Sequence, residues 1–272
     1  MRVSKRAKSL RRLERAAVIY WPAVDPRTVT VFKRCRMPSS RIDLLDLLRS
    51  LALVGMIAFH LSYDMLMFGL ISASYAGTDF FYLHARIVAG TFILTAGLGL
   101  YLAHASAIRW PSFWRRFSKI AAAAALVTIA TKFAMPQAYV YFGILHAIAL
   151  FSLLGLAVLR LSSLGSLLLA AAFISGCYWL RAPIFDLDLL RFVGLSDLPA
   201  YTIDFEPIFP WFGIFLLGIS LGQFGQTHGL WMRLSQIKSP AWATWAGRHS
   251  LPIYLIHQPI LLGLVWTIAQ LT

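Results

Sequence analysis

The chain is divided into apolar runs of about 20 residues, which are separated by short polar segments. Coiled into an α-helix, a run of this length matches the thickness of the hydrocarbon core of a bilayer. Hydrophobic residues make up 59% of the 272 residues and charged residues only 13%, whereas soluble domains have about 25% charged residues. The sequence therefore predicts an all-α polytopic membrane protein and excludes a soluble globular enzyme.

Seven apolar runs are present, and each predicts one transmembrane helix. Only Pro136 and Gln137 separate the third run from the fourth, so these two form either a tight hairpin or one broken element. The seven expected spans are residues 48–71, 84–103, 117–135, 138–160, 164–181, 207–225 and 250–271.

Basic residues concentrate before the first span, because residues 1–37 contain eleven Lys and Arg but only two acids. With a cytoplasmic N-terminus, 21 of the 25 basic residues fall on the cytoplasmic side, as the positive-inside rule requires. We therefore expect a C-terminus outside, a basic cytoplasmic tail over residues 1–40 and a transmembrane domain over residues 41–272. A basic tail can bind nucleic acid. Its position directly before an apolar span instead favours membrane lipid as the partner, and no nucleic acid.

The first span carries four ionisable residues, although each costs about 2.5–3.5 kcal/mol at the bilayer centre. At 100° per residue, Asp46, Arg49, His60 and Asp64 fall within about 60° of helix surface. One hypothesis is an acyl-transfer site, in which Arg49 binds a phosphate-bearing donor, His60 is the general base or acyl acceptor, and Asp64 orients the imidazole. The alternative is that these side chains only neutralise one another in pairs one turn apart.

Two further histidines, His146 and His257, lie inside the fourth and seventh spans. Each either approaches the polar stripe of the first span or is a core histidine bonded to a neighbouring helix. Three histidines inside the membrane also allow bis-histidine haem ligation, but their scattered depths argue against it. Cys35 and Cys177 show no metal-ligand spacing, so we expect no metal.

Polar and aromatic residues collect at the expected outer side, before the second and sixth spans. Asp204 and Glu206 would stand at the outer mouth of a cavity with His84 and Arg86, where Trp211 offers a stacking surface. Such a site can hold an amine- or hydroxyl-bearing sugar. Proline and aromatic residues also occur at membrane interfaces without any functional cause.

Bases also cluster on the expected inner side. Arg248 could bind coenzyme A phosphates together with Arg115, Arg116 and Lys119. The positive-inside rule alone also predicts bases at these positions, so their presence does not distinguish coenzyme A binding from membrane topology.

Four ordered segments resemble the bacterial branch of the heparan-α-glucosaminide N-acetyltransferase catalytic-domain family, within the superfamily of multispanning membrane acyltransferases. The first runs from Asp46 to Asp64. The others are 142–146 (FGILH), 207–218 (PIFPWFGIFLLG) and 248–259 (RHSLPIYLIHQP). In the first segment, the residue after the arginine is usually glycine, whereas here Arg49 is followed by Ser50.

The resemblance implies transfer of an acetyl or other acyl group from acyl-coenzyme A to a sugar-containing acceptor, a glycan or glycolipid. Donor and acceptor would approach from opposite faces of a bacterial inner membrane. Arg49 and His60 also match the arginine–histidine signature of membrane O-acyltransferases. From another class, the same polar stripe suits a proton-coupled transporter or carrier.

Overall fold

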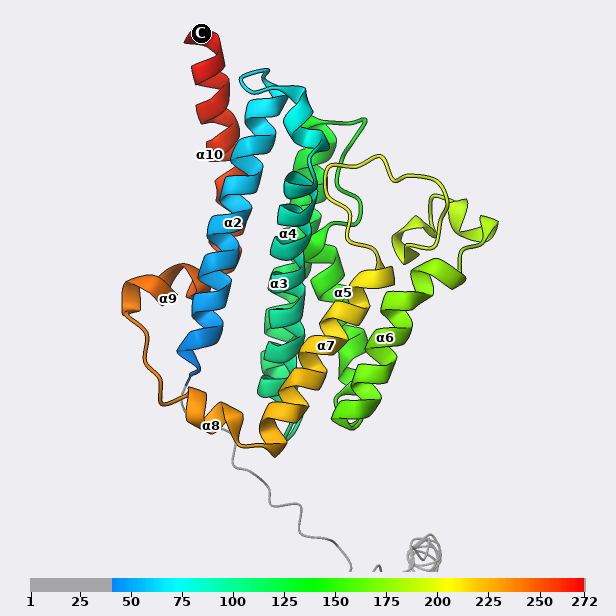
Figure 1. Ribbon diagram of the computed structural model, residues 1–272, viewed down its shortest axis with the longest axis vertical. Helices are drawn as coiled ribbons and strands as arrows, with labels where there is room; N and C mark the ends of the chain where they lie inside the picture. Colours follow the sequence, from blue (N-terminus) through cyan, green and yellow to red (C-terminus); the bar gives the residue numbers. More distant parts are fainter. Residues whose placement is uncertain (1–40, 272) are drawn as a thin grey trace, which may run out of the picture. The chain divides into compact units, whose positions relative to one another are not determined.

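The computed structural model describes residues 41–271, and the expected basic tail lies outside the described residues. Helices run through these residues in alternating directions, and no strand occurs among them (Figure 1). The long helices are α2 (Asp43–Met67), α3 (Asp79–His104), α4 (Trp110–Ala134), α5 (Ile144–Val158), α6 (Ser163–Trp179), α7 (Ile208–Thr227) and α10 (Ser250–Leu271). Short elements are α8 (Leu230–Leu234), α9 (Ala241–Arg248), and the 3₁₀ turns η1 (Ala73–Gly77), η2 (Pro183–Asp186) and η3 (Arg191–Val193).

Each of the seven expected spans corresponds to one of these long helices, but the seven-span count is not supported. Five of the helices are long and apolar enough to cross a membrane, whereas α5 and α6 have only 15 and 17 residues. A span needs about 20 residues at 1.5 Å per residue. The cytoplasmic N-terminus and the outer C-terminus stay predictions.

The short length of α5 has a local cause. Residues 138–142 were expected inside a span, but they form an irregular, non-helical segment that lies beside residues 202–206, with one isolated bridge between Phe142 and Phe205. The backbone amide of Ile203 donates to the carbonyl of Ala138 at 3.1 Å, and that of Glu206 donates to the carbonyl of Phe142 at 3.2 Å. The chain can therefore start α5 only at Ile144.

Small residues let the central helices approach closely. A Cβ on Gly97 of α3 would overlap the backbone carbonyl of Phe215 on α7, and one on Gly218 of α7 would overlap that of Leu94 on α3. Such glycines allow the close backbone contact that replaces hydrophobic driving force between membrane helices. The helices α2, α5 and α6 pack against the pair α3–α7, whereas α10 packs mainly on α2 and α4 mainly on α5.

The short helix α9 is docked on the start of α2. The backbone amide of Gly247 donates to Ser50 Oγ at 2.8 Å, and a Cβ at this glycine would overlap the carbonyl oxygen of Asp46. Ser50, which departs from the family signature, thus holds α9 against α2. Since α10 follows directly, this contact also fixes where α10 begins.

Candidate active site

Two buried carboxylates, Asp43 and Asp46, pair with more exposed arginines at the start of α2. Asp46 is 1% exposed and pairs with Arg41 at 2.8 Å, Arg49 at 3.2 Å and Arg248 at 3.4 Å. Arg248 also contacts Asp43 at 3.2 Å. The expected Asp46–Arg49 pair is therefore present, while Arg248 is held by two carboxylates.

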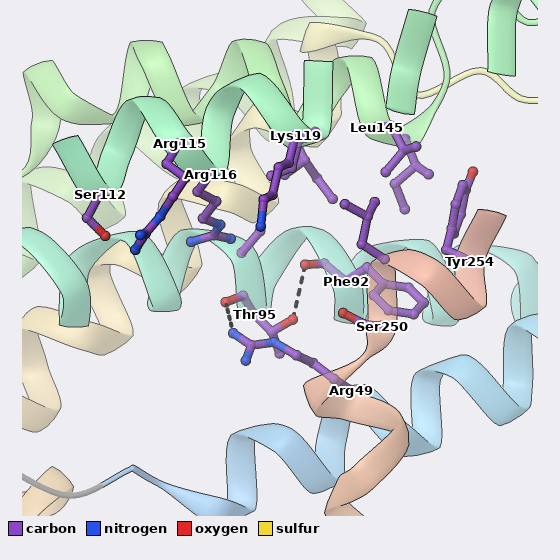
Figure 2. Close-up of a pocket in the computed structure, with 15 residues that line it drawn as sticks. Arg49, Phe92, Thr95, Ser112, Arg115, Arg116, Lys119, Leu145, Ser250 and Tyr254 are labelled. Carbon is purple, nitrogen blue, oxygen red and sulfur yellow. Dashed lines mark hydrogen bonds between the residues drawn. The ribbon is translucent and has the colours of Figure 1, made fainter. Parts of the chain in front are cut away.

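A cavity of about 350 Å³ opens between α2, α3, α4, α5 and α10. Four cations and no acid line it, and Arg49 is the α2 residue among them. Figure 2 shows the cations at one end of the cavity, with Leu145 and Tyr254 at the other. The lining residues are Arg49, Phe92, Thr95, Ala96, Ser112, Arg115, Arg116, Lys119, Ile120, Ile144, Leu145, Ile148, Ser250, Leu251 and Tyr254.

The cations gather because of helix spacing. Arg115, Arg116 and Lys119 lie within five residues on α4, and at 100° per residue they fall within about 100° of helix surface, on one side of that helix. Across the cavity, Arg49 donates to the backbone carbonyl of Thr95 at 3.3 Å and so points toward them (Figure 2). None of the three α4 bases forms an ion pair within residues 41–271. A bound anion would offset this concentrated positive charge.

The polar stripe of α2 is interrupted, and its residues do not all line one cavity. Leu53 and Met56, which are 1% and 4% exposed, lie on the same helix face between Arg49 and His60. His60, Asp64 and His257 are not among the cavity-lining residues. The cavity instead follows α10 to Tyr254.

His60 and His257 are neighbours, with ring centroids 5.0 Å apart. His257 Nδ1 lies 2.7 Å from the carbonyl oxygen of Tyr254, so Nδ1 carries the proton and Nε2 keeps its lone pair. Nε2 is buried and has no hydrogen-bond partner within the described chain. The carboxylate of Asp64 accepts from Gln258 Nε2 at 2.8 Å rather than from His60. This imidazole pair lies one turn beyond Tyr254 along α10.

Glu206, Arg86 and Trp211, which were expected at the outer mouth of a cavity, lie close together, and Asp204 lies near Glu206. Asp204 accepts from the backbone amide of Ile144 at 3.0 Å. The guanidinium of Arg86 lies 5.4 Å from the ring of Trp211 and interacts electrostatically with Glu206. Burial raises the pKa of Asp204 to about 6. Burial and the neighbouring Asp204 charge raise the pKa of Glu206 well above its usual value, and Arg86 opposes this.

The other two expected histidines are placed differently. His84 packs against Phe59, with ring centroids 5.9 Å apart, so its ring takes part in the aromatic contact between α2 and α3. His146 Nδ1 accepts from the amide of Gly143 at 3.3 Å, and its Nε2 lies 3.1 Å from Thr128 Oγ1. Both nitrogens of His146 therefore have partners, as in a core histidine.

Sequence reasoning missed Tyr254, which lies at the end of the cavity away from the cations (Figure 2), called the deep end below. It also left the bases of α4 explained by topology as readily as by ligand binding. Tyr254 precedes His257 by three residues on one helix face, so helical spacing could have found it. No three His, Cys, Asp or Glu side chains converge as a metal site between residues 41 and 271.

The model of the catalytic region of heparan-alpha-glucosaminide N-acetyltransferases matches residues 41–259. The chain belongs to this family. Membership indicates a membrane acyltransferase, and the family generally uses acetyl-coenzyme A as the donor. No curated protein and no solved structure matches the chain.

Proposed function

We propose that the protein transfers an acetyl or other acyl group from cytoplasmic acyl-coenzyme A to a sugar-containing acceptor, a glycan or glycolipid, at the outer face of a bacterial inner membrane. The observation that carries this proposal is the acid-free cationic cavity inside a member of an acetyltransferase family. Phosphate groups are the part of acyl-coenzyme A that such a cavity would recognise.

The donor would lie along the cavity. Its phosphates would contact Arg49, Arg115, Arg116 and Lys119, and its acyl end would point toward Tyr254. A volume of about 350 Å³ falls within the range of small-molecule sites. It accommodates part of the donor, so the remainder would extend from the open end. The apolar deep end suits a pantetheine arm and a short acyl group.

We assign the role of general base to His257, which lies one turn along α10 from the cavity-lining Tyr254 and whose Nε2 has no hydrogen-bond partner within residues 41–271. The acceptor amine or hydroxyl would lose its proton to His257 Nε2 as it attacks the thioester carbonyl. The C–S bond then breaks, and the same nitrogen returns the proton to the departing thiolate, so no proton is gained or lost. His60 contributes by packing against His257. Asp64 would act as a positioning residue through Gln258, which neighbours His257 in the chain.

The acceptor would bind beside Glu206, Arg86 and Trp211. Glu206 Oε2 and Trp211 Nε1 are both buried without a hydrogen-bond partner among residues 41–271. Buried polar atoms without partners are uncommon, and a ligand that supplies a donor and an acceptor would satisfy both. Sugars carry hydroxyl groups of this kind.

The test is acyl transfer by purified protein, with isotope-labelled acetyl-coenzyme A and a panel of amine- and hydroxyl-bearing sugars. We expect His257→Gln to lower the transfer rate at least 100-fold while acetyl-coenzyme A binding stays within threefold. His249→Gln is the matched control, since His249 is exposed, and it should keep full activity. Equal activity of His257→Gln and the wild type would contradict the assignment.

A proton-coupled transporter is the second candidate, because ionisable groups lie between helices α2 and α10. His60, His257 and Asp64 could carry protons along this interface. Protein reconstituted in liposomes would then move a solute under a proton gradient without any acyl donor. Transfer of label from acetyl-coenzyme A, with no such flux, would favour the enzyme.

A further inference from the structure

Asp204 lies directly behind the deep end of the cationic cavity. It accepts from the backbone amide of Ile144 at 3.0 Å, and the hydroxyl of Tyr254 donates to it. Ile144 and Tyr254 both line the cavity, whereas Asp204 does not. One side chain therefore holds two walls of the cavity, α5 and α10, from outside.

Gly143 makes this arrangement possible. A Cβ at position 143 would overlap Asp204 Oδ2, and it would come within 2.7 Å of Val140 Cγ1. Only a residue without a side chain leaves the carboxylate room to reach the first amide of α5. The sequence of the α5 start is thus matched to Asp204 from the 182–206 loop.

The segment that carries Asp204 is firmly attached. Thr202 Oγ1 donates to the carbonyl of Tyr139 at 2.8 Å. On either side of Asp204, Ile203 and Glu206 form the backbone hydrogen bonds to residues 138–142 described above. Because this segment is held in place, the contacts of Asp204 fix the positions of the two cavity walls, α5 and α10, relative to the loop.

We propose that Asp204 is a positioning residue that fixes the deep end of the donor cavity and couples the 182–206 loop to donor binding. The coupling to the donor rests on the proposed function, while the structural role of Asp204 does not. Loss of this carboxylate releases Tyr254 and the first turn of α5. The acyl end of the donor then loses its site, while the phosphate end keeps the four cations.

Binding of two ligands to the purified full chain reports separately on the deep end and on the cationic end of the cavity. Acetyl-coenzyme A reaches both, whereas adenosine 3′,5′-bisphosphate reaches only the cations. In Asp204→Ala we expect acetyl-coenzyme A affinity to fall about tenfold, because one buried hydrogen-bonded carboxylate is lost, and adenosine 3′,5′-bisphosphate affinity to stay within twofold. Gly143→Ala should reproduce this split by displacing the carboxylate. Asp204→Asn, which keeps an acceptor oxygen for Ile144, should restore acetyl-coenzyme A binding to within threefold.

Hydrogen–deuterium exchange tests the role of Asp204 without any ligand. Amides in peptides covering 140–148 should exchange about tenfold faster in Asp204→Ala. Asp197→Ala is the matched control from the same loop, since Asp197 forms an exposed pair with Arg181, and it should change neither readout. Unchanged exchange in Asp204→Ala would overturn the proposal. Equal weakening of both ligands would overturn it too, as would wild-type acetyl-coenzyme A affinity. A wild type that exchanges as expected but binds neither ligand would refute the proposed function alone.

Discussion

Replacement of Arg116 by glutamine should separate donor binding from stability. Arg116 lines the cavity and forms no ion pair within residues 41–271, so its charge is not needed for a structural contact. Nitrogens of Arg49 and Arg116 lie 3.0 and 3.9 Å from the position that a Cβ would take on Gly99. The two guanidinium groups therefore approach within about 7 Å of each other and repel.

Arg116→Gln should have opposite effects on the stability of the empty protein and on its affinity for the donor. At an effective dielectric constant of about 20, two charges 7 Å apart repel by about 2 kcal/mol. This is an upper limit, because Asp46 pairs with Arg49 and offsets part of its charge, so Arg116→Gln should stabilise the empty protein by up to this amount. The melting temperature should therefore rise by up to about 4–8 °C in a chain of this length. A lost charge-assisted hydrogen bond to phosphate costs about 1.5–3 kcal/mol, and donor affinity should fall about 10- to 100-fold.

The assay is thermal unfolding of detergent-purified protein, with and without acetyl-coenzyme A, together with titration calorimetry. Arg160→Gln is the matched control, since Arg160 is exposed and does not line the cavity. It should change neither quantity. A lower melting temperature in Arg116→Gln would refute the reasoning about uncompensated charge. Unchanged donor affinity would refute the phosphate-binding role.

Three further outcomes follow from the same contacts. Gly247→Ala should lower the free energy of unfolding by about 1–3 kcal/mol through overlap with Asp46, whereas Gly263→Ala, which meets no atom within 4 Å, should not; equal melting temperatures would contradict this. Burial raises the pKa of Asp204 to about 6, so the folded protein binds the proton of this carboxyl more tightly than the unfolded chain does. The resulting contribution to the free energy of unfolding is fully present below the unfolded pKa of 3.8 and is lost as pH rises through 6. The melting temperature of Asp204→Asn should therefore fall less than that of the wild type between pH 4 and 7, and parallel curves would argue against a raised pKa. Donor affinity should decrease as salt rises from 50 to 500 mM, about tenfold by screening of partly exposed charges, and a salt-independent titration would argue against phosphate contacts.

Hydropathy predicted the long helices because each one needs a continuous apolar run, and every expected range is met by a helix. It could not find the start of α5. Residues 138–142 are mostly apolar, as in a span, but backbone carbonyls of this segment accept hydrogen bonds from Thr202, Ile203 and Glu206, more than 60 positions away. Pairing between such distant segments leaves no periodic signal in either one.

The site was predicted in part. Helical spacing gave the Asp46–Arg49 pair correctly, because residues three apart meet on a helix surface. The same spacing places Leu53 and Met56 on the stripe between Arg49 and His60, so the interruption was visible in the sequence. The contact of His257 with His60 needed the packing of α10 on α2, which no local pattern contains.

The α4 bases show a different limit. Arg115, Arg116 and Lys119 satisfy the positive-inside rule whether or not they bind a ligand. Only the structure shows that they face a cavity without acids and that Arg49 faces it from the other side. Charge alone therefore could not distinguish topology from recognition at these positions.

The most direct measurement is a cryo-electron microscopy map of the protein in nanodiscs with acetyl-coenzyme A. We expect density for the phosphates within about 4 Å of Arg115, Arg116 and Lys119, and density for the thioester beside Tyr254. Phosphate density at Arg248, or donor density outside the cavity between α2, α3, α4, α5 and α10, would contradict a donor site in this cavity.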